Sequence, residues 1–374
     1  MRVGLSTTTI EPALTHGRLD GIGVYTSAML KALPQAGCTV QGYSFAPAGG
    51  SVKAAALSAG TPMPRSFALA SLADLVVPFS KTRLPVDVYH ATDYRIVRMA
   101  CPVVATLHDA ITLKHPEWCR PKLRALKNWA QKCATAKADR IIALSHFAVA
   151  ELVEYFDVDP QRISVVACGV DAEWMTPPPV SAVDRTLRSN GLERGYFLFV
   201  GTLQPRKNID RIIDAYRALP PAVRRARQLV LVGSVGWRCD DLISKIRGLI
   251  QNGETIVWLS QLVDHEQLRH VYAGAGVFVF PSLYEGFGIP VTEAFASGIP
   301  VLTSNTTSLP EVSQGAALEI DPLSVADISL AMQSLAQDDL LRARCVAAGR
   351  RRAAQLTWQS TAEQTVAVYR AALG

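Results

Sequence analysis

The sequence predicts an α/β protein built from two domains, each with a parallel sheet. Three observations support this prediction. The chain has 374 residues, which is enough for two domains of ordinary size. Short apolar runs alternate with helical stretches along both halves, as in sheets whose parallel strands are joined by helices. A proline-bearing segment, 176–195, predicts a linker between a domain over 1–175 and another over 196–357.

The first domain is predicted to contain six strands. Apolar runs with the length of buried strands lie at 1–8, 38–45, 87–91, 102–107, 140–144 and 163–167. Helices are predicted between some of these strands, over 24–33 and 66–78 among others. The carboxylates of Asp157 and Asp159, separated by one valine, precede Pro160. This short run is interpreted as a turn, so no metal ion is expected there.

The second domain repeats the alternation over five predicted strands, at 196–200, 228–232, 255–259, 276–280 and 300–303. The spacing leaves the order of the strands in the sheet open. Between the last two strands, a glycine-bearing loop over 284–288 leads into a short helix. Pro290 suits the first position of that helix, and Gly298 suits the residue just past its end. Ligands of open α/β sheets bind at loops of this kind, beyond the carboxyl ends of strands.

The composition indicates a well-filled globular core, because 49% of the residues are hydrophobic and 19% are charged. No apolar run reaches the roughly 18 residues of a membrane-spanning helix, and the first residues lack the apolar region of a signal peptide. Seven cysteines are scattered without a CxxC pair, so neither a disulfide framework nor a zinc site is expected. These features predict a cytoplasmic protein with reduced thiols.

The net charge of +6 suits nucleic acid, an anionic membrane surface or an anionic substrate. Most of the excess lies in the stretch 113–140, where Trp118 and Trp129 are interleaved with basic residues. Two interpretations stay open. The stretch is either a solvated helix face with core tryptophans, or a surface that rests on anionic headgroups at about 1 kcal/mol for each basic residue. Nucleic acid is not expected as a partner, since no recognisable binding module accompanies the charge.

Two carboxylates stand out near the loop over 284–288. Glu285 lies in the loop, and Glu293 is placed in the first turn of the following helix. Carboxylates accept hydrogen bonds from vicinal hydroxyls, whereas the amides of Phe287 and Gly288 at a helix N-terminus suit a phosphate. A sugar nucleotide carries both kinds of group. Taken alone, a loop glutamate is more often solvated, and a first-turn glutamate more often only interacts favourably with the helix dipole.

The loop that follows the strand over 196–200 adds positive charge. It reads GTLQPRKN, with Arg206 and Lys207 where the loop enters a helix and Asn208 as the expected cap. A helix start with two cations suits a diphosphate, because Arg forks across two oxygens and Lys adds a point charge. An isolated Arg-Lys pair is more often solvated surface.

Two further candidates lie in the first domain, where the strand over 102–107 runs directly into His108 and Asp109. An imidazole at the carboxyl end of a strand lies on the ligand-binding side of such a sheet. For a single histidine, packing is an equally good explanation. The glycines of the loop over 16–23 do not complete the GxGxxG pattern, so no dinucleotide fingerprint is present.

Together these motifs resemble the retaining glycosyltransferases of family 4, which have the GT-B fold. The runs that carry the resemblance are EGFGIP followed by Glu293, GTLQPRKN, GIGVYT and TLHDAITLKHPEW. The resemblance implies two Rossmann-like domains facing across a cleft, with acceptor binding in the first and nucleotide-sugar binding in the second. It also implies that a C-terminal helix over 358–374 crosses back to the first domain. One departure is Thr202, where some members carry an additional Arg.

The resemblance also implies a role for each candidate in the second domain. Glu285 would contact the donor sugar, and Glu293 would contact the donor ribose. Arg206 and Lys207, with the amides at the start of the helix, would bind the donor diphosphate and stabilise it as it leaves. No cofactor is implied beyond the nucleotide diphosphate sugar, which enters as a co-substrate, and no metal ion is implied.

In the first domain, the resemblance makes His108 a catalytic candidate together with Glu285, since the family's histidine lies near the donor sugar and the acceptor. Asp109 would orient His108 or bind the acceptor. The amide of Gly23, in the run GIGVYT, would approach the donor phosphates.

The expected reaction is transfer of a hexosyl unit to a hydroxyl of a glycan acceptor, with retained anomeric configuration. The form GTLQPRKN looks most like mannosyltransferases that use GDP-mannose, and a UDP-sugar donor is the alternative. The expected acceptor is a polyprenyl-diphosphate-linked glycan for a surface polysaccharide, at the inner face of the plasma membrane. Other readings are a phosphorylase or synthase of the same fold, and a non-catalytic partner that only binds nucleotide sugars.

Overall fold

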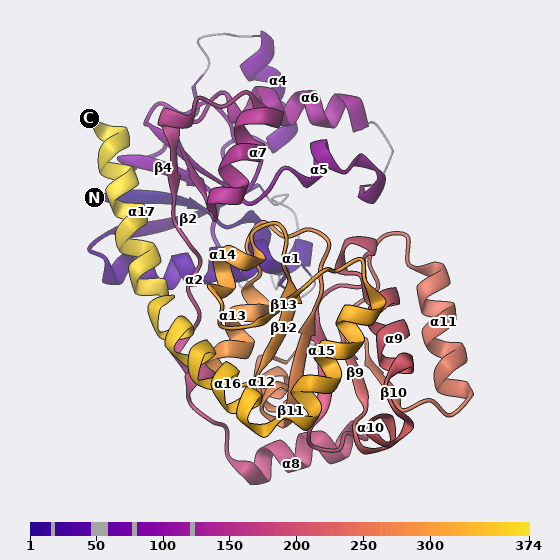
Figure 1. Cartoon of the computed structure of the whole chain (residues 1–374). Coiled ribbons are helices and arrows are strands. Elements are labelled where there is room, and N and C mark those ends of the chain that lie inside the picture. The colour runs from indigo at the N-terminus through magenta and orange to yellow at the C-terminus, as the bar shows by residue number, and fades with distance from the viewer. Residues whose placement is uncertain (16–18, 46–58, 77–80, 120–123, 263) are drawn as a thin grey trace. The chain divides into compact units, whose positions relative to one another are not determined.

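The computed structural model describes residues 1–15, 19–45, 59–76, 81–119, 124–262 and 264–374. Their contacts divide the chain into two compact units (Figure 1). Unit 1 comprises Met1–Lys114, Pro121–Gly169 and Trp358–Gly374, and unit 2 comprises His115–Arg120 and Val170–Thr357. No helix among the described residues is long and apolar enough to cross a membrane.

Unit 1 contains a parallel sheet with the strand order β3-β2-β1-β4-β5-β6-β7. The strands are β1 (Arg2–Ser6), β2 (Thr39–Ser44), β3 (Thr61–Pro62), β4 (Val88–Ala91), β5 (Val103–Leu107), β6 (Arg140–Ala143) and β7 (Ile163–Val165). The six predicted strands are present. β3 was not predicted, because two residues ending in a proline give no periodic signal.

The helices of unit 1 cover both faces of this sheet. They are α1 (Pro12–Thr15), α2 (Gly21–Gln35), α4 (Phe67–Val76), α5 (Ile111–Lys114), α6 (Arg124–Thr135), α7 (His146–Phe156) and α17 (Trp358–Leu373), with the 3-10 turns η1 (Thr8–Ile10) and η3 (Pro160–Arg162). Alternation along β4 separates the faces. Tyr89 and Ala91 join a core with α4, α6 and α7, whereas His90 bonds to Tyr369 of α17.

The basic stretch 113–140 is not one continuous helix. It contains the end of α5, the 3-10 turn η2 (Pro116–Trp118) and α6, and residues 120–123 lie outside the described part. The run from Asp157 to Pro160 is a turn, as predicted. Asp157 adopts the left-handed conformation at the end of α7, and the Asp159 carboxylate accepts a hydrogen bond from the Gln161 amide at 2.9 Å.

Unit 2 contains a second parallel sheet, with the order β10-β9-β8-β11-β12-β13. The strands are β8 (Tyr196–Val200), β9 (Leu229–Val232), β10 (Ile256–Leu259), β11 (Ala275–Phe280), β12 (Val301–Ser304) and β13 (Leu318–Ile320). The five predicted strands are present and β13 was missed. The strand order reverses between β8 and β11, and such a reversal is where open α/β sheets bind their ligands.

Helices flank this sheet, with α9 packed against α15 and α13 against α16. The helices are α8 (Val180–Ser189), α9 (Ile209–Ala218), α10 (Pro221–Ala226), α11 (Asp240–Gln251), α12 (His265–Gly274), α13 (Ile289–Ala296), α14 (Leu309–Ser313), α15 (Val325–Gln337) and α16 (Asp339–Gln355), with the 3-10 turns η4 (Ala172–Met175) and η5 (Pro205–Lys207). Residues 176–195, expected to be a linker, belong to unit 2, and their helix α8 packs on α12.

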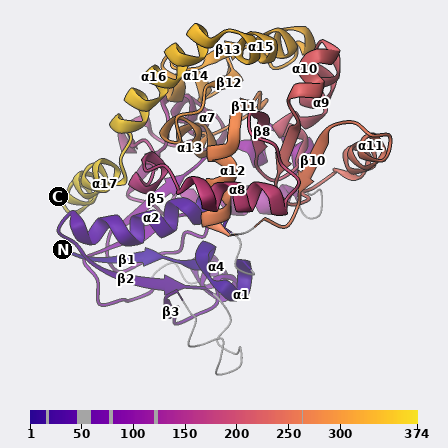
Figure 2. The same cartoon turned by 90° about the horizontal axis from the view of Figure 1, so that it is seen from below.

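The C-terminal helix α17 packs within unit 1, although it follows all of unit 2 in the chain. In Figure 2 the yellow α17 lies beside the indigo α2, and the two helices are in contact. The Tyr369 hydroxyl lies 2.6 Å from Nδ1 of the buried His90, and the Thr361 hydroxyl donates to the Ala167 carbonyl at 2.8 Å. The predicted return of this helix to the first domain is confirmed.

Candidate functional site

The reversal of strand order in unit 2 brings together the loops that follow β8 and β11. Asn208 connects them, because its side-chain amide donates to the carbonyls of Pro281 at 2.9 Å and Pro322 at 2.6 Å. The Leu283 amide also donates to the Arg206 carbonyl at 2.8 Å. Asn208 is the N-cap residue of α9, as predicted. Its side chain makes no capping hydrogen bond and instead fixes the two loops to each other.

These loops form a charged triad of Arg206, Lys207 and Glu285. One carboxylate oxygen of Glu285 accepts from Lys207 Nζ at 2.5 Å, and the other accepts from Arg206 Nη1 at 2.8 Å. The side chains of Lys207 and Glu285 are each 9% exposed. Burial by itself would raise the pKa of Glu285, but the charges of Arg206 and Lys207 outweigh it and lower that pKa to about 2. Glu285 is therefore ionised at neutral pH.

The triad combines residues that were predicted to have separate functions. Glu285 was assigned to sugar hydroxyls, and the two cations were assigned to a diphosphate. Without a ligand, the Glu285 carboxylate is instead the counter-ion of both cations. Lys207 is further held over the Phe280 ring, with Nζ 4.8 Å from its centroid. An anion that enters this site must compete with Glu285 for the same N–H donors.

The N-terminus of α13 provides amide donors beside the triad. Gly288 precedes the helix with φ of +112°, and an added Cβ would lie 2.8 Å from the Leu309 side chain, so glycine is required there. Among the described residues, the amides of Phe287 and Gly288 have no hydrogen-bond acceptor. Unpaired amides at a helix start suit an anionic oxygen, as the sequence predicted for this position.

Glu293 lies on α13 and has a different environment from Glu285. It was predicted in the first turn of the helix, but the helix starts at Ile289, so Glu293 lies in the second turn. Its carboxylate is buried and accepts a hydrogen bond from the Tyr272 hydroxyl at 3.0 Å. Burial is the main cause that raises the pKa of Glu293 to about 8. A protonated Glu293 can both donate to and accept from a hydroxyl group.

Gly23, His108 and Asp109 belong to unit 1. His108 is buried at the end of β5, and its Nε2 lies 2.9 Å from the Thr92 carbonyl. A carbonyl only accepts, so Nε2 carries the proton of the neutral ring and Nδ1 keeps a lone pair. Burial lowers the pKa of His108, which favours this neutral form. A neutral imidazole can accept a hydrogen bond from a sugar or acceptor hydroxyl.

Asp109 and Gly23 are both engaged in local hydrogen bonds. The Asp109 carboxylate accepts from the Ile111 amide, at the start of the short helix α5, at 3.1 Å. The Gly23 amide, predicted to approach phosphates, donates to the Asp20 carboxylate at 2.8 Å. The helix α2 starts at Gly21 instead of Val24, so Gly23 lies in its first turn. A phosphate at this amide would have to displace a carboxylate.

The basic stretch is partly neutralised by acids from other segments. Three of its lysines form ion pairs: Lys114 with Glu151 at 2.7 Å, Lys132 with Asp157 at 3.3 Å and Lys137 with Asp74 at 2.7 Å. Lys127 is exposed and has no ion-pair partner among the described residues. Trp129 is 50% exposed, which rules it out as a core tryptophan. The surface is therefore less basic than the sequence of this stretch suggests.

Tyr272 and Asp20 were not predicted from the sequence. Tyr272 lies 21 positions before its hydrogen-bond partner Glu293 and on another helix, so no local pattern connects them. Asp20 carried a usable signal, because an aspartate directly before a helix start is a typical cap. No group of three or more His, Cys, Asp and Glu among the described residues is placed to hold a metal ion.

Two family models match the chain. One, described as Glycosyl transferases group 1, matches residues 185–352, and the other, described as Glycosyltransferase Family 4, matches residues 19–174. The O-antigen chain mannosyltransferase B of Escherichia coli is 33% identical over 288 residues, which make up 76% of this chain and 74% of that protein. The chain belongs to glycosyltransferase family 4.

Further similarities agree with this assignment. The MMP alpha-(1->4)-mannosyltransferase of Mycolicibacterium hassiacum is 29% identical over 338 residues, 84% of this chain and 77% of that protein. Sucrose-phosphate synthase from Thermosynechococcus elongatus superimposes with a TM-score of 0.76 at 22% identity, over 99% of this chain and 98% of that one. The fold is therefore GT-B, and the protein is a glycosyltransferase.

Proposed function

We propose that this glycosyltransferase moves a mannosyl unit from GDP-mannose to a hydroxyl of a glycan acceptor, with retention of the anomeric configuration. The observation that carries the proposal is the naming of both relatives above as mannosyltransferases, one of them at 33% identity. The charged triad in unit 2 supports it, because its two cations suit a diphosphate and its carboxylate suits sugar hydroxyls.

In the proposed mechanism, the donor diphosphate replaces the Glu285 carboxylate as the partner of Arg206 and Lys207. Two positive charges and the amides of Phe287 and Gly288 then face the oxygens on which negative charge develops as the sugar leaves. Charge placed there in advance is usually the largest single catalytic effect. Glu285, released from the cations, accepts hydrogen bonds from the hydroxyls of the transferred sugar.

We assign retention to a mechanism in which the diphosphate leaves and the acceptor hydroxyl attacks on the same face of the sugar. Neither glutamate suits the role of a nucleophile that forms a covalent intermediate. In this mechanism Glu285 accepts hydrogen bonds from the hydroxyls of the transferred sugar, and Glu293 is buried with a pKa of about 8 and bonded to Tyr272. Glu293 is proposed to bind the donor ribose. No metal ion is needed in this mechanism, because Arg206 and Lys207 supply the same formal charge as one magnesium ion.

We propose a lipid-linked acceptor, a polyprenyl-diphosphate-linked glycan, in the synthesis of a surface polysaccharide. The name of the Escherichia coli relative, which refers to the O-antigen chain, supports this choice. The exposed Lys127 and Trp129 of α6 support a peripheral position of the protein on the cytoplasmic face of an anionic membrane.

A donor panel tests the proposal. Purified protein is given GDP-mannose, UDP-glucose and UDP-galactose in turn, and release of the nucleotide diphosphate is measured with mannoside acceptors present. GDP-mannose is expected to give the fastest release, and nuclear magnetic resonance of the product should show an α linkage formed from the α donor. Faster turnover of a UDP-sugar would replace the proposed donor. Near-native turnover by Glu285→Ala would remove the proposed site.

A further inference from the structure

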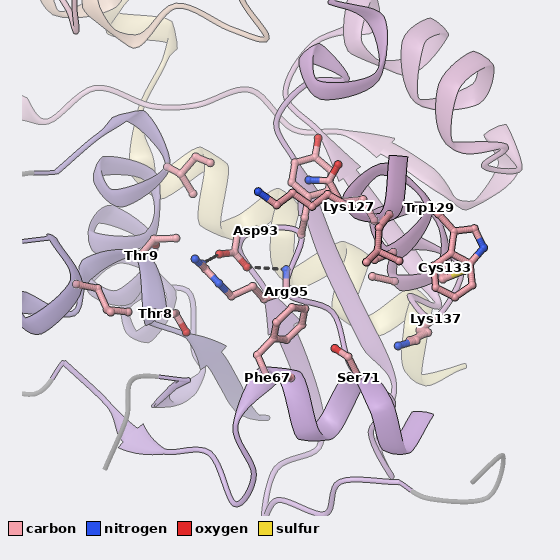
Figure 3. A pocket seen from close by; sticks show the side chains of 18 of the residues that line it. Thr8, Thr9, Phe67, Ser71, Asp93, Arg95, Lys127, Trp129, Cys133 and Lys137 are labelled. Atoms are coloured by element: carbon pink, nitrogen blue, oxygen red, sulfur yellow. Dashed lines mark hydrogen bonds and ion pairs between the residues drawn. The ribbon is translucent and has the colours of Figure 1, made fainter. Parts of the chain in front are cut away.

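Unit 1 contains a large pocket, and none of the assigned site residues lines it. Its volume is about 990 Å³, at the upper end of the range typical of small-molecule sites. The walls come from η1, α1, the start of α2, α4, α6 and the loop after β4. Figure 3 shows Trp129 and Cys133 of α6 on one side, Thr8 and Thr9 on the other, and the Asp93–Arg95 pair between them.

One wall of the pocket is an apolar stripe of α6. Leu126, Trp129, Ala130 and Cys133 are spaced three and four positions apart, so they share one face of the helix, and all four line the pocket. Leu126 is 58% exposed and Trp129 is 50% exposed. A stripe with this spacing is normally buried in a core. Here it faces an open pocket, and Phe67 of α4 adds to the apolar wall.

The polar end of the pocket adjoins the catalytic candidate of unit 1. Asp93 is buried and accepts from the Arg95 amide at 2.9 Å, and it directly follows Thr92, whose carbonyl bonds to His108. Tyr94 also lines the pocket, and its hydroxyl donates to the Asp109 carbonyl. Asp93 and Tyr94 therefore connect this wall of the pocket to His108 and Asp109.

A cation in the lining indicates the kind of ligand. Lys127 lines the pocket from α6, has no ion-pair partner among the described residues, and lies on a helix without an acidic residue. Apolar walls that include such a cation complement a hydrocarbon chain that carries an anionic group.

We infer that this pocket binds the hydrocarbon chain of an amphiphilic acceptor next to its phosphate-bearing end. The inference rests on the proposed function, because it names the part of a lipid-linked acceptor that unit 1 recognises. Each methylene that leaves water contributes about a fourfold gain in affinity. Binding should therefore depend on chain length far more than on the phosphate.

A binding experiment tests the pocket without any transfer reaction. The full-length protein is titrated with inorganic phosphate and with butyl, octyl and decyl phosphate, and the fluorescence of Trp129 is followed, with Trp129→Phe to identify its signal. We expect no binding of inorganic phosphate and a steep rise in affinity from butyl to decyl phosphate, with a blue shift as the chain covers the indole. Affinity independent of chain length would overturn the inference.

Two matched variants locate the site. Ala130→Trp fills the pocket from α6, whereas Ala125→Trp places the same side chain on an exposed position of α6 that does not line it. The first should lose at least tenfold in decyl phosphate affinity, and the second should bind like the native protein. Thermal unfolding of both variants verifies that they are folded. Equal decyl phosphate affinity of the two variants would contradict the assignment of the ligand to this pocket. So would a native protein that dimerises and binds no decyl phosphate.

A transfer assay separates the pocket from the proposed function. With GDP-mannose as donor, decyl mannoside should show a much lower KM than methyl mannoside, and Ala130→Trp should abolish the difference without the same loss in kcat. If no mannoside accepts mannose, the proposed function fails, while the alkyl phosphate titration still decides the pocket. If methyl and decyl mannoside have equal KM values, the pocket is not part of the acceptor site.

Discussion

Glu285→Gln should weaken the fold and yet improve binding of a nucleoside diphosphate. The substitution keeps the shape of the side chain and removes its charge, so Arg206 and Lys207 lose the carboxylate that holds them at 2.8 and 2.5 Å. The pKa of Glu285 is lowered from 4.5 to about 2. At about 1.36 kcal/mol for each pKa unit, the ionised carboxylate contributes about 3 kcal/mol to stability at neutral pH.

The sign of this contribution fixes its pH dependence. A lowered pKa in the folded state means that the stabilisation is complete above pH 4.5 and is lost as the pH falls towards 2. Urea unfolding at pH 7 should therefore give a free energy about 3 kcal/mol lower for Glu285→Gln than for the native protein. Near pH 3 the two proteins should differ much less.

Ligand affinity should change in the opposite direction. In the native protein, the diphosphate displaces a competing carboxylate, whereas in Glu285→Gln the two cations are already available. We expect GDP to bind about tenfold to a hundredfold more tightly to the variant by calorimetry, while sugar transfer is lost.

Glu254→Gln is the matched control, because Glu254 also pairs with two arginines, Arg217 at 3.3 Å and Arg224 at 3.4 Å, but near the surface. It should cost about 1 kcal/mol or less and leave GDP affinity unchanged. A Glu285→Gln protein with native stability and native GDP affinity would refute the role given to the triad.

Four other predictions address the remaining parts of the molecule. Lys207→Ala should weaken GDP binding about tenfold to a hundredfold, as loss of a charge-assisted hydrogen bond does, and an unchanged Kd by calorimetry would contradict this. The pKa of Glu293 is raised to about 8, so the native protein loses stability as the pH rises from 4.5 to 8. Glu293→Gln lacks this loss, and urea unfolding should show it gaining stability relative to the native protein across that range. A difference in unfolding free energy that stays constant with pH would contradict this prediction. Sugar transfer should continue in excess EDTA. If EDTA abolished transfer and magnesium or manganese restored it, the proposed metal-free diphosphate site would be wrong. Charge reversal at Arg120, Arg124 and Lys127 should release the protein from anionic vesicles, as should high salt, and equal native binding to neutral and anionic vesicles in flotation would reject the electrostatic account.

Periodicity predicted the larger elements of the fold well, because their residues carry the signal locally. Every predicted strand is present in its sheet, within a few residues at each end. The exceptions are short: β3 has two residues and β13 has three. A strand of that length is defined by the neighbour it pairs with, and its own sequence gives little indication of it.

Candidate site residues were found by motif, but their partners were not. The runs EGFGIP and GTLQPRKN located Glu285, Arg206 and Lys207, although no spacing rule shows that a carboxylate 78 positions after a lysine is its ion-pair partner. The hydrogen-bond partners of Glu293 and Gly23 were also not predicted from the sequence. The basic stretch gave a misleading impression of charge, since its neutralising acids, such as Asp74 and Glu151, lie elsewhere in the chain.

The return of α17 to unit 1 also orders the folding of the chain during synthesis. The strands of unit 1 leave the ribosome first, yet Tyr369, which closes over His90, is made after all of unit 2. Unit 2 is continuous from Val170 to Thr357, apart from the short segment at 115–120. It can therefore complete its core while the face of unit 1 that α17 covers is still open. The earlier half of the protein is finished last, because one face of its sheet stays uncovered until α17 has been made.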